Sequence, residues 1–215
     1  MRFTTTASLL AISASLLIQS AQGAVTWRFS GTIATVDPAL GTEVVPGDAW
    51  QIDVTFDDSA GPIGNFGSSA FYGIQQSTLT YFATGGDLVA TSTLNDLNHS
   101  ISVQNDSGGR DFFTVDFSHG GGTPGLVPFS LNGEEIFDFN LSLSDFTQTA
   151  FNSTALPTSI DLNDFSLRQG RSQFGDSGFD VTYNVSDFTI VPEPQTFAIP
   201  ALIAAGVFYI RRRKQ

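Results

Sequence analysis

The stretch from residue 136 to residue 144 decides the fold class, and it reads Ile136-Phe137-Asp138-Phe139-Asn140-Leu141-Ser142-Leu143-Ser144. From Phe137 onward, apolar residues alternate with polar ones at every second position. Successive side chains of a β-strand point to opposite faces. The pattern therefore predicts a strand with one face in a core and the other face in water.

The same alternation recurs along the chain, in the segments 27–33, 52–56, 113–117 and 181–185. Turn-forming residues separate these segments, as in Asn132-Gly133. No stretch between the two ends of the chain has a convincing helical period. We therefore expect an all-β domain of two antiparallel sheets packed face to face, a β-sandwich of jelly-roll-like topology, with a closed barrel as the alternative.

Charge and cysteine content exclude several classes of function. The chain has 21 acidic and nine basic residues among 215, no cysteine, and a net charge of −12. Most of the basic residues lie near the termini, so the middle of the chain is strongly acidic and we expect no nucleic-acid partner. Without cysteine, the apolar core must hold the domain together, and thiol chemistry is excluded.

The N-terminus has the three parts of a secretory signal peptide. Arg2 precedes an apolar run over residues 7–18, and small residues occupy the cleavage positions in Ala21-Gln22-Gly23, which Ala24 follows. This pattern predicts a signal helix over residues 1–23, with cleavage between Gly23 and Ala24. We expect residues 24–190, the acidic β-domain, to be exported through the inner membrane.

The C-terminus combines a proline motif, an apolar stretch and a basic end. The motif is Val191-Pro192-Glu193-Pro194, the apolar stretch covers residues 197–210, and the basic end comprises Arg211, Arg212, Arg213 and Lys214. The two prolines hold the chain extended and expose Glu193. The apolar stretch predicts a short transmembrane helix of roughly 21 Å. The basic residues after it keep the C-terminus in the cytoplasm, so the domain stands outside.

Residues 191–215 resemble the PEP-CTERM sorting signal of bacteria that make exopolysaccharide. The resemblance implies that an exosortase, a membrane-embedded cysteine transpeptidase-like enzyme, recognises the Pro-Glu-Pro stretch. It also implies that the protein is membrane-anchored at first and then passes to the outer surface or the extracellular matrix. The resemblance implies an address for the protein and no activity.

Acidic turns are the candidate ligand sites of the domain. Ca²⁺ takes several oxygen ligands, and Asp57, Asp58, Asp106 and Asp111 supply carboxylates in two turns. Their spacing differs from that of an EF-hand loop. We name these four residues as candidate calcium ligands and expect no other cofactor.

Two hypotheses from different classes remain for the function. The first is a noncatalytic envelope or matrix protein that binds polysaccharide or cations. The second is a carbohydrate-active enzyme, a glycoside hydrolase or lyase on a jelly-roll, which needs two carboxylates across a groove. The only histidines, His99 and His119, lack the spacing of a hydrolytic zinc site. We therefore prefer the noncatalytic protein and assign no catalytic residue.

Overall fold

The computed structural model describes residues 24–92, 99–117, 129–175 and 177–191. The predicted signal peptide, the Pro-Glu-Pro residues, the apolar stretch 197–210 and the basic end lie outside these ranges. Within the ranges, helical structure is limited to two 3-10 turns, η1 (Pro38–Leu40) and η2 (Leu162–Asp164). Neither turn has the length and apolar character needed to cross a membrane.

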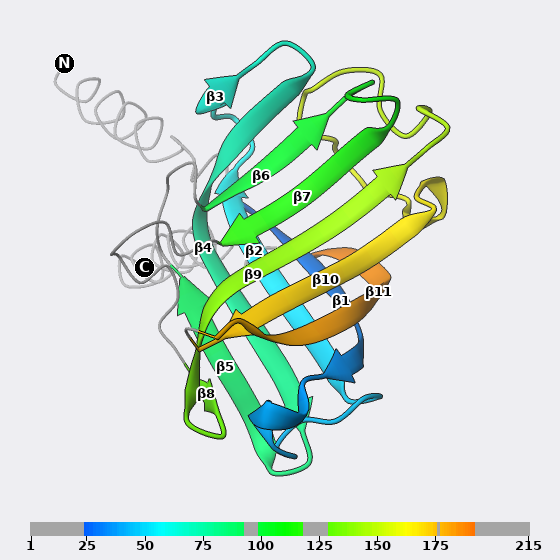
Figure 1. Ribbon diagram of the computed structural model, residues 1–215. Coiled ribbons are helices and arrows are strands. Elements are labelled where there is room, and N and C mark those ends of the chain that lie inside the picture. Colours follow the sequence, from blue (N-terminus) through cyan, green and yellow to red (C-terminus); the bar gives the residue numbers. More distant parts are fainter. Residues whose placement is uncertain (1–23, 93–98, 118–128, 176, 192–215) are drawn as a thin grey trace, which may run out of the picture.

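Antiparallel strands close into a barrel, which Figure 1 shows with its strands strongly tilted. Eight strands form the ring, because β11 pairs with β1 and β10 pairs with β9. In order around the barrel they are β1 (Ala24–Val36), β2 (Ala49–Asp57), β4 (Ser69–Ala83), β6 (His99–Gln104), β7 (Asp111–Phe117), β9 (Glu134–Asp145), β10 (Leu167–Phe174) and β11 (Phe179–Val191). Outside the ring, β3 (Gly64–Asn65) and β5 (Gly86–Ser92) pair with β4, and β8 (Ser130–Leu131) pairs with β9.

The all-β prediction is confirmed, whereas the predicted β-sandwich is wrong. β10 pairs with β9 along one edge and with β11 along the other, so the sheet is continuous where a sandwich would be divided. A barrel and a sandwich require the same alternation of apolar and polar residues. The alternation that predicted the strands therefore carried no information about closure.

The segment 136–144 forms most of β9 and follows the predicted alternation in large part. Phe139, Leu141 and Leu143 are fully buried, while Asp138 and Asn140 lie on the outer face. A register shift opposite Phe174 of β10 interrupts the alternation at the start of the strand. Ile136 is therefore buried instead of Phe137.

Aromatic side chains fill the interior of the barrel. Trp27 packs on Phe56 with ring centroids 4.4 Å apart, and Trp50 packs on Tyr183 at 4.7 Å. Both tryptophans are almost completely buried, with 2% and 0% of their surface exposed. In a ring of this strand number side chains can fill the interior, and here they do so as a packed core.

Three buried hydroxyl groups hydrogen-bond to one another inside this core. The Tyr81 hydroxyl donates to Ser172 Oγ at 3.1 Å, and the Tyr183 hydroxyl contacts both groups. Burial raises the pKa of Tyr81 and of Tyr183 well above the usual value. Both phenols therefore stay neutral at physiological pH, and the three groups supply one another's hydrogen bonds.

Both described ends of the chain lie at one end of the barrel. Thr26 of β1 lies opposite Val191 of β11, and Ala24 lies opposite Asp57 of β2. Because the strands are antiparallel, the connections 58–68, 105–110 and 146–166 lie at this same end. We call this end the terminal rim, and we call the opposite end, which includes residues 37–48, the distal rim.

Candidate functional site

The connection between β9 and β10, residues 146–166, closes the terminal rim. Its apolar side chains, including Phe151, Leu156 and Phe165, pack against the core of the barrel. The Tyr72 hydroxyl of β4 donates to the carbonyl oxygen of Thr154 at 2.9 Å, which fixes the far side of the loop. We call residues 146–166 the cap.

Asp145, the last residue of β9, organises the start of the cap. Its carboxylate accepts hydrogen bonds from the backbone amides of Thr147 and Thr149 at 2.7 Å and of Ala150 at 3.0 Å. The Thr147 hydroxyl donates to the same carboxylate at 2.6 Å. These bonds, the one from the Thr147 hydroxyl first among them, hold the pKa of Asp145 far below its usual range. Asp145 is therefore an ionised carboxylate with a structural role.

Asp111 lies opposite Asp145 in the ladder between β7 and β9 and is fully buried. One carboxylate oxygen accepts from the amide of Asp106 at 3.0 Å, and the other accepts from the amide of Phe151 at 2.8 Å. Asp111 therefore ties the turn 105–110 to the cap. Both of its oxygens already have protein partners.

The other three predicted calcium candidates lie at the terminal rim, Asp57 at the end of β2 and Asp58 and Asp106 in the connections 58–68 and 105–110. The Asp57 carboxylate accepts from the hydroxyl of Ser59 at 2.6 Å and from its amide at 2.9 Å, which lowers the pKa of Asp57. Asp58 and Asp106 have exposed side chains. Among the described residues, no three acidic or histidine side chains are grouped so that they could hold a metal ion.

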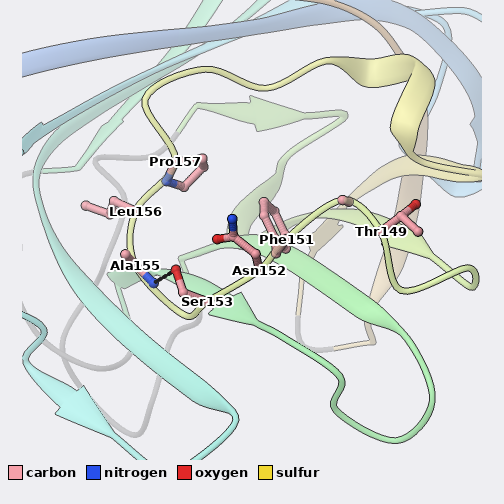
Figure 2. A pocket seen from close by; sticks show the side chains of 8 residues that line it. Thr149, Phe151, Asn152, Ser153, Ala155, Leu156 and Pro157 are labelled. Atoms are coloured by element: carbon pink, nitrogen blue, oxygen red, sulfur yellow. Dashed lines mark hydrogen bonds between the residues drawn. The ribbon is translucent and has the colours of Figure 1, made fainter.

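The cap lines an open pocket of about 250 Å³. Figure 2 shows that its lining comes from one continuous stretch of the cap, from Thr149 to Pro157. The Ser153 hydroxyl lies inside this stretch and accepts from the amide of Ala155 at 3.3 Å. The pocket is polar in part, with Asn152 and Ser153 beside Phe151 and Leu156.

Acidic side chains also gather on the outer face of β7, β9 and β11. Asp138 of β9 and Asp180 of β11 both lie opposite Gln173 of β10, and Asp116 lies on β7, the other neighbour of β9. Burial, and next the negative charge of Asp116, raise the pKa of Asp138 to about 6. Arg171 donates to Asp180 at 2.7 Å and is the cation that offsets this charge.

Comparison with known proteins identifies no relative of this chain. No protein-family model matches this chain. Searches of curated proteins and of solved structures find no significant match.

The residues that the sequence singled out lie in different parts of the barrel. Ala24, which follows the predicted signal peptide, and Val191, which begins the predicted sorting motif, both lie at the terminal rim. Of the four calcium candidates, Asp111 is buried, Asp57 is partly buried, and Asp58 and Asp106 are exposed. His99 is buried beside Phe117, with ring centroids 6.0 Å apart. Sequence reasoning missed the role of Asp145, although an Asp two residues before a Thr is a signal for a side-chain-capped turn.

Proposed function

We propose that this chain is an exported, noncatalytic protein of the cell envelope or extracellular matrix, sorted by an exosortase through its C-terminal tail. The resemblance of residues 191–215 to a sorting signal supports the route. The observation that carries the proposal is the position of Val191, which ends the last strand of the barrel beside Thr26. Pro192 follows directly, so the motif begins where the folded domain ends.

This placement suits processing at a membrane surface. The Pro-Glu-Pro residues follow the terminal rim without an intervening strand of the barrel. A membrane-embedded enzyme can therefore reach the peptide without opening the ladder between β1 and β11. Ala24, the first residue after the predicted leader, lies at the same rim, so the domain folds between its two targeting segments as one unit.

The ligand-binding part of the proposal concerns the outer surface and the cap. The barrel interior is occupied by aromatic side chains, which leaves the exterior to contact a partner. We assign polysaccharide to the polar cap pocket and cations, Ca²⁺ among them, to exposed carboxylates such as Asp58. The strongly acidic surface favours neutral polymers and cations over anionic partners.

The geometry of the two buried acids favours this function over a glycosidase. Asp111 and Asp145 lie side by side as partners in the ladder between β7 and β9, whereas a glycosidase holds its two carboxylates across a groove. Their oxygens accept hydrogen bonds from amides of the cap and of the 105–110 turn. Acids held in this way stabilise a loop and are poorly placed to exchange protons with a substrate. The jelly-roll on which the enzyme hypothesis rested is also absent from the described sheet.

The sorting proposal is tested by the location of variants in the native host. We expect the wild-type protein to leave the inner membrane, and Glu193→Ala to remain there because the exosortase no longer recognises the motif. Gln195→Ala, just outside the Pro-Glu-Pro residues, is the matched control and should behave like the wild type. A Glu193→Ala protein that reaches the surface in normal amounts would overturn the proposal.

The binding part is tested by sedimentation of the mature protein with insoluble exopolysaccharide from the same host. We expect co-sedimentation, and we expect Asn152→Ala to weaken it because this side chain lines the cap pocket. Repeating the assay with and without a calcium chelator separates cation-dependent binding from direct binding. Retention in the supernatant under both conditions would remove polysaccharide from the proposed partners.

A further inference from the structure

The hairpin of β3 and β4 exposes apolar side chains at the terminal rim, where Figure 1 shows it extending at one end of the barrel. Phe66 at its tip has 68% of its surface exposed, and Ile63 has 44%. The ring of Phe66 stands edge-on to Phe71, with centroids 5.8 Å apart. The amide of Phe66 donates to the carbonyl oxygen of Ser69 at 2.8 Å, which closes the tip. The exposed Phe66 ring is therefore held by a hydrogen-bonded turn.

The charge pattern of the chain sets this hairpin apart. No charged residue occurs between Asp58 and Asp87, although the chain has 21 acidic residues. Phe66 and Ile63 are therefore exposed apolar side chains in a segment without charge, which suits contact with an apolar partner. A lipid interface accepts aromatic and aliphatic side chains of this kind.

The length of the tail limits how far the hairpin can stand from a membrane. Five residues, 192–196, separate Val191 from the apolar stretch 197–210. An extended linker of this length spans roughly 15 to 20 Å. Once the stretch is in a bilayer, the rim that carries Val191 is therefore held close to the lipid surface.

We propose that the tip of the β3–β4 hairpin docks on the lipid bilayer, with Phe66 and Ile63 in the interfacial layer. This inference rests on the proposed function, because an anchored tail is what holds the terminal rim at the membrane. Phe146 and Ile190 of the same rim are 58% and 46% exposed and add apolar surface. The orientation directs the distal rim away from the membrane, toward soluble partners.

Because the chain contains no cysteine, a single introduced cysteine can be labelled at a chosen position. The full chain carries Asn65→Cys beside the tip, labelled with a polarity-sensitive fluorophore, and is reconstituted into phosphatidylcholine vesicles that contain a lipid-borne quencher. Thr42→Cys, exposed on the distal rim, is the matched control. We expect quenching at residue 65 to be at least about twofold that at residue 42. Adding Phe66→Ser should lower the quenching at residue 65 to the control level.

Each outcome has a separate meaning. If the protein does not float with the vesicles, the anchoring tail fails, and the docking inference fails with it. If it floats but the two positions are quenched equally, docking is wrong while the proposed function stands. A change in the residue 65 signal that appears without vesicles and grows with protein concentration would assign the hairpin to contact between copies and overturn docking.

Discussion

Asp138 illustrates how one side chain couples stability to pH. Burial and the neighbouring Asp116 raise its pKa to about 6, compared with about 3.9 in an unfolded chain. Between these values the folded state binds more protons than the unfolded state. The contribution of Asp138 to the free energy of unfolding therefore falls as pH rises from about 4 to about 6.

Replacing Asp138 by Asn removes this penalty, because Asn does not ionise. We expect Asp138→Asn to match the wild type near pH 4 and to be more stable by about 1 kcal/mol at pH 7, since partial exposure screens the charge. Urea denaturation at both pH values measures the difference. Asp187→Asn, at an exposed position on β11, is the control. A stability difference for Asp138→Asn that does not grow with pH would contradict this account.

Gly31 shows a second residue-scale constraint, at the irregularity where β1 and β11 shift register. A Cβ atom at this position would lie 1.9 Å from the backbone oxygen of Asn184, which also accepts a hydrogen bond from the indole of Trp50 at 3.2 Å. We expect Gly31→Ala to destabilise the protein by about 2 to 3 kcal/mol, because the backbone of β1 or of β11 near Asn184 must move to make room for the added atom. Thermal denaturation measures the loss. Gly61→Ala, where the added atom meets nothing within 4 Å, should be close to neutral.

Among the structural elements, the cap depends on Asp145. Asn at this position keeps one acceptor oxygen and loses the charge, so it cannot replace all the hydrogen bonds from Thr147, Thr149 and Ala150. We expect Asp145→Asn to lower stability by about 1 to 3 kcal/mol. Amide hydrogen exchange should become faster within residues 147–151 before it does so in β1 or β2. Unchanged exchange in the cap would show that other contacts hold it.

The elements also show which parts of the fold the sequence could predict. The segments 52–56, 113–117 and 181–185 were recognised because large apolar residues occupy every inward position. β10 was missed, because its inward positions include Gly170 and Ser172. A Cβ at Gly170 would lie 2.7 Å from the ring of Tyr183, so the strand needs a small residue there. The strand that closes the barrel therefore lacks the apolar pattern by which strands are found.

The candidate site was predictable only in part, for a similar reason. Asp111 was named for its carboxylate, but its partners, the amides of Asp106 and Phe151, come together through the register of β7 and β9. Local sequence does not encode that register. The clustering of both chain ends at one rim likewise follows from the pairing of β1 with β11.

At the scale of the whole molecule, the closed ring of strands predicts that the barrel unfolds cooperatively. Trp27 and Trp50 lie in the packed interior on β1 and β2, and every strand of the ring has two paired neighbours. We expect denaturation curves of the mature protein from tryptophan fluorescence and from far-ultraviolet circular dichroism to coincide. Separate midpoints would mean that part of the barrel opens independently of the rest.

The proposed function requires export followed by sorting. Its most direct test is the intact mass of the protein recovered from the surface or matrix of its own host. We expect a polypeptide that begins at Ala24 and lacks the apolar stretch 197–210. A recovered chain whose mass still includes residues 1–23 and residues 197–215 would contradict it.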